Sequence, residues 1–194
     1  MKTLIMMAAF ALGATAVKAQ SETFKPFRVG FDFGYAVPSG EGAKGGVALS
    51  LEPKYAISDK LALGLRMEAA VTVRGNIDDE GFASDGEAKA SGSYLLTTDY
   101  YFNTNSFRPF VGIGAGIHTL ASASFDNTDL TSDDDVEALE AIEGGTKLGV
   151  TPRIGFDYGH FRMAVDYNLV GKTGEVKNNY LNLKIGFFLG GGRR

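Results

Sequence analysis

The sequence has 194 residues, which is room for one domain, and a formal net charge of −4. The negative charge argues against nucleic-acid binding, because that function uses basic surfaces that neutralise phosphates. The chain contains no Cys, so packing and backbone pairing alone must hold its fold together. Its 26 Gly, 14 Phe and 8 Tyr residues are typical of a β-rich protein rather than of a helical membrane protein.

Residues 1–19 have the pattern of a secretory signal peptide. A positive start with Lys2 precedes an apolar run from Leu4 to Ala16, and the small residue Ala19 precedes a polar segment. The run is shorter than the roughly 20 apolar residues that a membrane-spanning helix needs. We expect cleavage after Ala19, which leaves residues 20–194 as the mature domain; a buried N-terminal helix is the alternative.

The mature chain is dominated by segments in which apolar and polar residues alternate, the pattern of strands with one apolar face. In the first segment Val29, Phe31, Phe33, Tyr35 and Val37 share one face. Each segment has about the 9–11 residues that a tilted strand needs to cross a bilayer. The sequence therefore predicts an all-β fold, an eight-stranded antiparallel up-and-down transmembrane β-barrel. The predicted strands are Arg28–Val37, Gly46–Tyr55, Leu61–Arg74, Gly92–Phe102, Phe110–Leu120, Thr146–Tyr158, Phe161–Leu169 and Asn179–Leu189.

The connections between these strands alternate in length, which predicts short periplasmic turns and longer extracellular loops. The short turns are 56–60, 103–106 and 159–160, and the longer links are 38–45, 75–91, 121–145 and 170–178. Aromatic residues gather near the short-turn ends, as in the aromatic belt of a membrane interface. This predicted belt consists of Tyr55, Tyr100, Tyr101, Phe102, Phe107, Phe156, Tyr158, Phe161, Phe187 and Phe188.

The polar face of the strands is rich in Gly, Ala and Ser, which suits the narrow interior of a barrel in which the apolar face meets lipid. Charges on this face fall at similar heights, about four to seven residues from the short-turn ends. Because buried charges must be paired, we predict a salt-bridged plug, with Asp99, Asp157 and Arg162 below it. The alternative is scattered, solvated charge. The predicted layer contains Asp32, Glu52, Arg66, Glu68, Arg153, Asp166 and Lys184.

The central hairpin resembles that of the eight-stranded outer-membrane barrel superfamily, which includes outer membrane proteins A, X and W. The aromatic end Tyr100–Phe102 is followed by Arg108-Pro109-Phe110 and a strand with Gly at alternate positions. The last strand, with Phe187-Phe188, is similar to an assembly signal, although Gly190–Arg194 follow where many members end on an aromatic residue. The resemblance implies an outer-membrane location in a Gram-negative bacterium and contact with membrane lipids and lipopolysaccharide. It does not imply one function.

The link 121–145 is strongly acidic and contains no base. One interpretation is a solvated, mobile loop without a ligand. The other, more specific interpretation is a loop that binds divalent cations or a cationic extracellular partner. The Asp spacing does not match a calcium-binding loop. The link 75–91 is also mostly acidic. The acidic residues of the longer link are Asp126, Asp129, Asp133, Asp134, Asp135, Glu137, Glu140 and Glu143.

Three sets of residues are candidates for a chemical site. Gly112, Gly114 and Gly116 lack the further glycine and the helix of a dinucleotide-binding loop, and relief of crowding inside the barrel explains them better. His118 has no Ser beside it for a lipid-modifying triad, although partners on other strands are not excluded. His160 lies in a predicted turn. We therefore expect no catalytic residues, no cofactor and no metal site.

The leading functional hypothesis is a monomeric, non-catalytic barrel with a closed lumen that has a structural or surface-interaction role. The alternatives are a small transport barrel for apolar solutes, a lipid-A-modifying enzyme and a soluble calycin-like carrier. The transport hypothesis requires an apolar lumen above the charged layer, whereas the inward positions there are small or polar, for example Gly34, Ser50 and Ser93.

Overall fold

The computed structural model describes residues 23–39, 43–77, 83–126, 145–173 and 176–193. The predicted signal peptide and the acidic positions Asp129, Asp133, Asp134, Asp135, Glu137, Glu140 and Glu143 lie outside these ranges. Among the described residues, no helix is long and apolar enough to cross a membrane.

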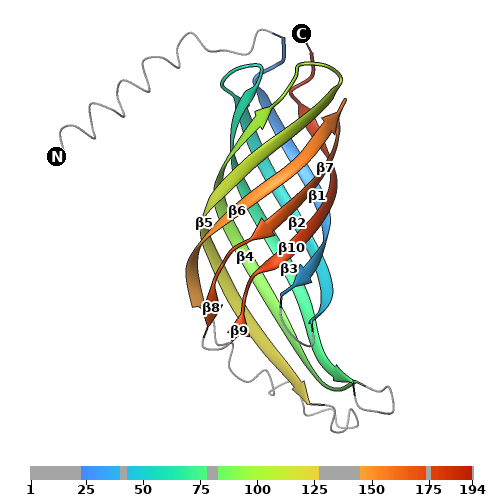
Figure 1. The fold of residues 1–194 in the computed structure, drawn as a ribbon, viewed down its shortest axis with the longest axis vertical. Helices are drawn as coiled ribbons and strands as arrows, with labels where there is room; N and C mark the ends of the chain where they lie inside the picture. The colour runs from blue at the N-terminus through green and yellow to red at the C-terminus, as the bar shows by residue number, and fades with distance from the viewer. Residues whose placement is uncertain (1–22, 40–42, 78–82, 127–144, 174–175, 194) are drawn as a thin grey trace, which may run out of the picture.

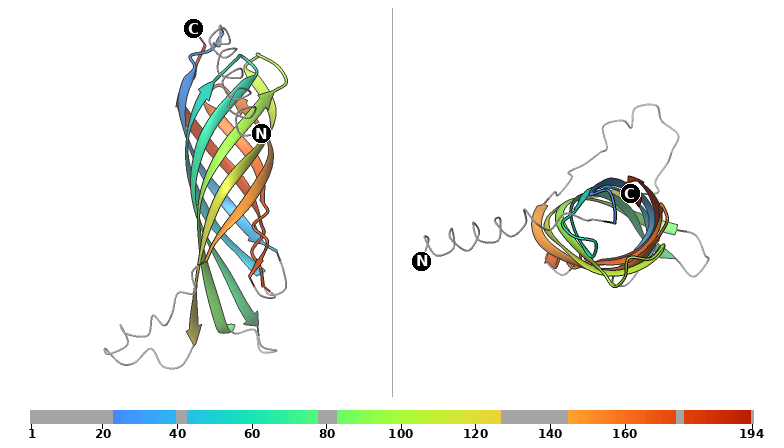
Figure 2. Two further views of the ribbon diagram at one scale, coloured as in Figure 1. Left: turned by 90° about the vertical axis from the view of Figure 1, so that its left-hand side faces the viewer. Right: turned by 90° about the horizontal axis from the view of Figure 1, so that it is seen from above.

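Eight antiparallel strands close into a single barrel in the order β1-β10-β7-β6-β5-β4-β3-β2 (Figures 1 and 2). Each strand pairs with its neighbours along the chain, and β1 closes the barrel against β10, so the predicted up-and-down topology is confirmed. Closure gives every barrel strand a partner on both sides, which strands that cross lipid require. The strands are β1 (Phe27–Pro38), β2 (Ala43–Ala56), β3 (Leu61–Ile77), β4 (Ala83–Tyr101), β5 (Phe107–Asp126), β6 (Gly145–Tyr158), β7 (Phe161–Asn168) and β10 (Tyr180–Gly190).

Several strands extend beyond their predicted ends, and the largest extensions are in β4 and β5. β4 starts at Ala83 and β5 ends at Asp126, because antiparallel pairing continues to Ile77–Ala83 and to Asp85–Asp126. Parts of the two acidic links are therefore strand, and Asp126 is the last residue of β5. The extended ends of β3, β4 and β5 project past the other strands (Figure 2). The link 170–178 contains a small hairpin of β8 (Lys172–Thr173) and β9 (Val176–Lys177).

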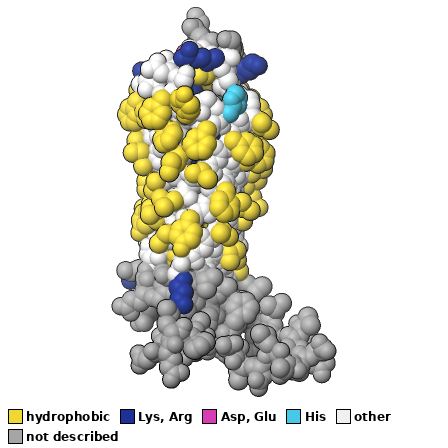
Figure 3. Space-filling model, turned by 90° about the vertical axis from the view of Figure 1, so that its right-hand side faces the viewer, with side chains coloured by type: hydrophobic (Ala, Val, Ile, Leu, Met, Phe, Trp, Pro, Cys, Tyr) yellow, Lys and Arg dark blue, Asp and Glu magenta, His cyan; other side chains and the backbone are white. Residues whose placement is uncertain are grey.

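The alternation of the sequence sorts side chains into an apolar outer face and a polar inner face. In β1 every second residue from Arg28 to Ala36 is buried, while Phe31, Phe33 and Tyr35 are exposed. Apolar side chains cover much of the wall on the face shown in Figure 3, and every barrel strand has exposed large hydrophobic residues. A soluble protein does not expose so large an apolar surface, so the exterior is suited to lipid.

Two aromatic residues of the predicted belt lie inside the barrel instead. Tyr101 and Phe188 are buried, and Tyr101 packs with Phe110, Ala62 and Ala164 in a small core at the short-turn end. Their strand neighbours point outward, so strict alternation places both side chains inward. The prediction from aromatic clustering was wrong for these two residues.

A proline interrupts the ladder between β6 and β7. Val150 and Leu169 form an isolated bridge with backbone hydrogen bonds of 3.2 and 2.9 Å. Hydrogen-bonded pairs recur every two residues in an antiparallel ladder, so the next such pair is Pro152 with Tyr167. Pro152 has no N–H to donate, and continuous pairing begins only at Arg153.

A second gap coincides with Pro53 on β2. The β2–β3 pairing stops after Leu51–Met67 and resumes at Lys54–Gly64, so this interruption is flanked by paired residues on both sides. Beyond the Val150 bridge, by contrast, the described residues of β6 pair only with β5. The β6–β7 contact therefore has less continuous backbone pairing than the β2–β3 contact.

Candidate functional site

The lumen is crossed by a network of ion pairs, here called the periplasmic network. Arg153 Nη1 lies 2.8 Å from Glu52 Oε1 and its Nη2 lies 2.6 Å from Asp99 Oδ1. Arg162 contacts Glu52 and Asp99 at 3.2 Å each, and its Nε lies 2.8 Å from Asp157 Oδ1. All these side chains are buried. The network joins strands β2, β4, β6 and β7 through the interior.

Two further cations complete the periplasmic network. Lys54 Nζ lies 3.1 Å from Glu52 and also forms an ion pair with Asp99. Arg28 Nη1 donates a hydrogen bond of 2.6 Å to Asp157 Oδ2, which brings β1 into the network. Each carboxylate thus contacts at least two cations, which offsets the desolvation cost of burying charge.

A second cluster, the extracellular network, lies farther along the lumen. Asp166 of β7 contacts both Arg66 of β3 and Lys184 of β10, the latter at 2.7 Å. Glu68 forms an ion pair with Lys184, lies 3.8 Å from Arg66 and accepts a 2.8 Å hydrogen bond from Tyr180. Two acids and two bases therefore balance, and they connect β3, β7 and β10.

The structure divides the predicted charged layer between these networks. Glu52 and Arg153 lie in the periplasmic network, and Arg66, Glu68, Asp166 and Lys184 form the extracellular network. Asp99, Asp157 and Arg162, which we expected below the layer, share ion pairs with it. Sequence reasoning missed Arg28 and Lys54 as members, although period-two alternation places both on the inner face.

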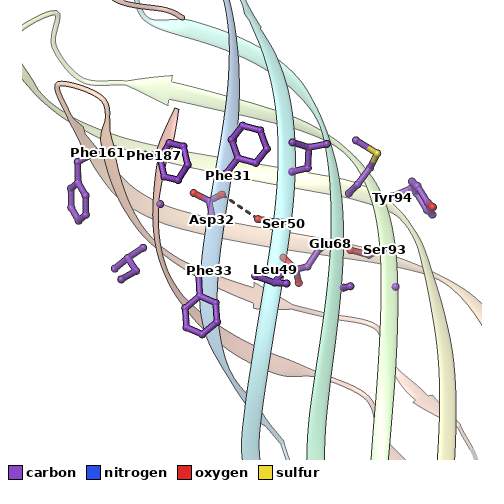
Figure 4. A pocket seen from close by; sticks show the side chains of 16 residues that line it. Phe31, Asp32, Phe33, Leu49, Ser50, Glu68, Ser93, Tyr94, Phe161 and Phe187 are labelled. Carbon is purple, nitrogen blue, oxygen red and sulfur yellow. Dashed lines mark hydrogen bonds between the residues drawn. The ribbon is translucent and has the colours of Figure 1, made fainter. Parts of the chain in front are cut away.

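Asp32 differs from the other predicted layer residues. It accepts a 3.2 Å hydrogen bond from Ser50 Oγ, and among the described residues no cation forms an ion pair with it. Asp32, Ser50, Glu68 and Ser93 occupy one register row across β1 to β4. These four line part of a groove of about 880 Å³, whose other lining residues are mostly apolar and lipid-facing (Figure 4). The groove therefore has little hydrogen-bonding chemistry of its own.

Aromatic rings support the cations of the periplasmic network. The Arg162 guanidinium lies 4.6 Å from the centre of the Phe110 ring, and that of Arg28 lies 4.5 Å from the Phe188 ring. Tyr101 Oη donates a 2.9 Å hydrogen bond to Asp157 Oδ2. Cation–π contacts of this kind are strengthened by desolvation. The inward rings thus hold the guanidinium groups in place.

The histidines do not assemble a catalytic arrangement among the described residues. His118 is buried in the lumen against Gly149, and neither ring nitrogen has a hydrogen-bond partner in the described part of the chain. His160 is exposed in the turn between β6 and β7, with its ring 5.4 Å from that of Phe188. Within the described ranges, no group of three His, Asp or Glu residues could hold a metal ion.

A closed eight-stranded barrel with an apolar exterior and an ion-paired interior defines an outer-membrane β-barrel protein. The chain belongs to the outer membrane protein beta-barrel domain family, whose model matches residues 4–187. It is located in the outer membrane, so the soluble carrier hypothesis is wrong. No curated protein sequence matches the chain.

Two solved structures have a similar fold. Neisserial surface protein A is 18% identical with a TM-score of 0.59, and the match covers 87% of this chain and 99% of that chain. The outer membrane protein OprG from Pseudomonas aeruginosa is 18% identical with a TM-score of 0.50, and the match covers 89% of this chain and all of that chain, at 100%. At this identity the likeness establishes the fold alone.

Proposed function

We propose that this protein is a closed, non-catalytic barrel that anchors extracellular loops for a structural or surface-interaction role. The observation that carries the proposal is the periplasmic network, in which Glu52, Asp99 and Arg162 join side chains from opposite walls of the lumen. In an eight-stranded barrel the interior is only wide enough for side chains. A network across that space obstructs the passage of ions.

The lumen composition supports this role over the alternatives. On the extracellular side of the networks, the polar side chains of Asn168, Asn182, Ser93 and His118 share the interior with a packed apolar cluster. Packed side chains support a closed lumen over a passage for an apolar solute. The cluster consists of Ala36, Ala48, Ala70, Val170 and Tyr180. His118 has no Ser or carboxylate within hydrogen-bonding distance among the described residues, which does not favour the lipid-A-modifying hypothesis. Unchanged lipid A mass spectra from expressing and deleted cells are the expected result; a modified species would overturn the non-catalytic role.

Conductance in planar bilayers tests the closed lumen. We expect no steady current from the wild-type protein. The variant Arg153→Ala/Arg162→Ala, which removes two cations from the periplasmic network, should conduct and serves as the control that the assay detects an open lumen. A steady open-pore current from the wild-type protein would overturn the proposal.

The surface-interaction role is proposed for the acidic link 121–145. Its carboxylates, including Asp133, Asp134 and Asp135, suit divalent cations or a cationic partner. Calcium should raise the melting temperature of the wild-type protein, and a variant with Asn at these three positions should respond less. No shift at millimolar calcium would remove the cation-binding part and leave a cationic partner as the remaining hypothesis.

A further inference from the structure

Residues 23–25 and the C-terminal segment 192–193 are hydrogen-bonded to each other across the short-turn end of the barrel, and together they form a cap there. The Thr23 backbone N–H and Oγ1 donate hydrogen bonds of 3.0 and 2.9 Å to the two carboxylate oxygens of Asp59. Lys25 donates a 2.9 Å backbone hydrogen bond to Gly192, and Phe24 forms a β-bridge with Arg193. The segment 23–25 is thus held against both the C-terminal segment and the β2–β3 turn.

This cap presents three exposed cations, Lys25, Lys60 and Arg193, here called the basic rim. Among the described residues, none of the three forms an ion pair. Arg193 Nη2 donates a 2.6 Å hydrogen bond to the carbonyl of Thr104 in the β4–β5 turn, which fixes the position of the side chain. The rim therefore consists of cations attached to a rigid surface.

The described part of this end has three exposed cations and one acid, so its charge is positive on balance. Within residues 23–27, 55–61, 101–107, 158–161 and 189–193, the only acid is Asp59. Both its carboxylate oxygens accept the hydrogen bonds from Thr23. Basic side chains lie at this end above the apolar wall, and no acidic side chain is visible on the face shown in Figure 3. The rim is therefore a positively charged surface.

The aromatic belt fixes the height of the basic rim in the membrane. The rings of Tyr55, Phe102, Phe107 and Tyr158 are exposed on the outer wall just below the cap. Exposed aromatic rings lie at the boundary between hydrocarbon and headgroups. The cations above them therefore lie at the level of the lipid phosphates of the inner leaflet.

We propose that the basic rim binds the phosphate groups of anionic phospholipids in the inner leaflet. Anionic lipids attract each nearby Lys or Arg by about 1 kcal/mol, which corresponds to about fivefold in an equilibrium constant. The opposite rim differs, because two of the four longer links there, 75–91 and 121–145, are strongly acidic. The two ends of the barrel then differ in their attraction for anionic phospholipid.

The test measures the association of spin-labelled phosphatidylglycerol and phosphatidylcholine with the full-length mature protein in phosphatidylcholine nanodiscs. We expect the wild-type protein to prefer phosphatidylglycerol by about fivefold or more, because fivefold is the factor for a single cation near the bound lipid. Lys25→Gln/Lys60→Gln should lose most of that preference, and adding Arg193→Gln should abolish it. High salt should also weaken the preference in the wild-type protein, because the cations are exposed.

The matched control is Lys44→Gln/Lys172→Gln, which removes the same charge from exposed lysines at the opposite rim. It should retain the preference. Heat-modifiable migration on a gel confirms that every variant is folded. The proposal is wrong if the wild-type protein shows no preference, or if the control variant loses it instead.

Discussion

Arg153 of β6 and Asp99 of β4 form an ion pair directly over Gly112 of the intervening strand β5. Arg153 Nε and Nη2 lie 2.7 and 2.6 Å from Asp99 Oδ1. Gly112 pairs with Asp99 on one side and with Arg153 on the other, so the three residues form one row. A Cβ at position 112 would lie 2.3 Å from that Oδ1 and 2.9 Å from that Nε. The ion pair therefore requires glycine at this position.

The substitution Gly112→Ala should separate Arg153 from Asp99 and destabilise the barrel by about 2–4 kcal/mol, because buried charges lose their partners. Urea unfolding in detergent micelles measures this change. Gly92→Ala is the control, since a Cβ there has no neighbour within 4 Å. It should be neutral or stabilising, because alanine restricts the unfolded strand. Equal stabilities of the two variants would contradict the requirement for glycine.

Neutralising Asp99 should cost far more than neutralising Asp32. Asp99 contacts Lys54, Arg153 and Arg162, so Asp99→Asn should destabilise the barrel by about 3–5 kcal/mol. Asp32 has only the hydrogen bond from Ser50, so Asp32→Asn should stay within about 1 kcal/mol of the wild-type protein. The two free energies of unfolding provide the comparison. A larger loss for Asp32→Asn would mean that the ion pairs are not the source of stability.

In the extracellular network, removing both members of an ion pair should destabilise the barrel less than removing one member. Asp166→Asn leaves Arg66 and Lys184 with Glu68 alone, whereas Asp166→Asn/Lys184→Met leaves the balanced pair of Arg66 and Glu68. A double-mutant cycle with the single Lys184→Met variant should give a coupling of about 1–3 kcal/mol. Additive losses would show that the two side chains act independently.

Hydrogen exchange should be fastest, within the barrel wall, where β6 meets β7. The amides of Val150 and Leu169 belong to an isolated bridge beside Pro152 and should exchange faster than amides next to Pro53, whose gap is flanked by paired residues. Pro152→Val restores a donor and should slow exchange at both bridge amides. Pro53→Val is the matched control and should leave them unchanged. Similar exchange in all three proteins would contradict this account.

The strand pattern accounts for most of the fold that could be predicted. Alternation fixes which side chains share a face, so it anticipated the inward positions of Glu52, Arg66 and Asp166. Alternation did not predict where β4 starts and where β5 ends. Those extensions depend on the two strands pairing with each other beyond the predicted membrane span. The clustering of aromatic residues placed Tyr101 and Phe188 in the belt, where alternation alone would have turned them inward.

The sequence by itself determined the number of barrel strands, their apolar outer face and the presence of buried charge, because each follows from local period-two patterning and strand length. Only the tertiary structure decided which charges meet. Arg153 pairs with Asp99 across Gly112, and Asp166 pairs with Lys184, because closure and register bring strands distant in the chain to the same height. Asp32 lies on the same inner face and in the same row as Glu68, but only Glu68 has ion pairs among the described residues, so the inward position alone does not decide which acid is paired.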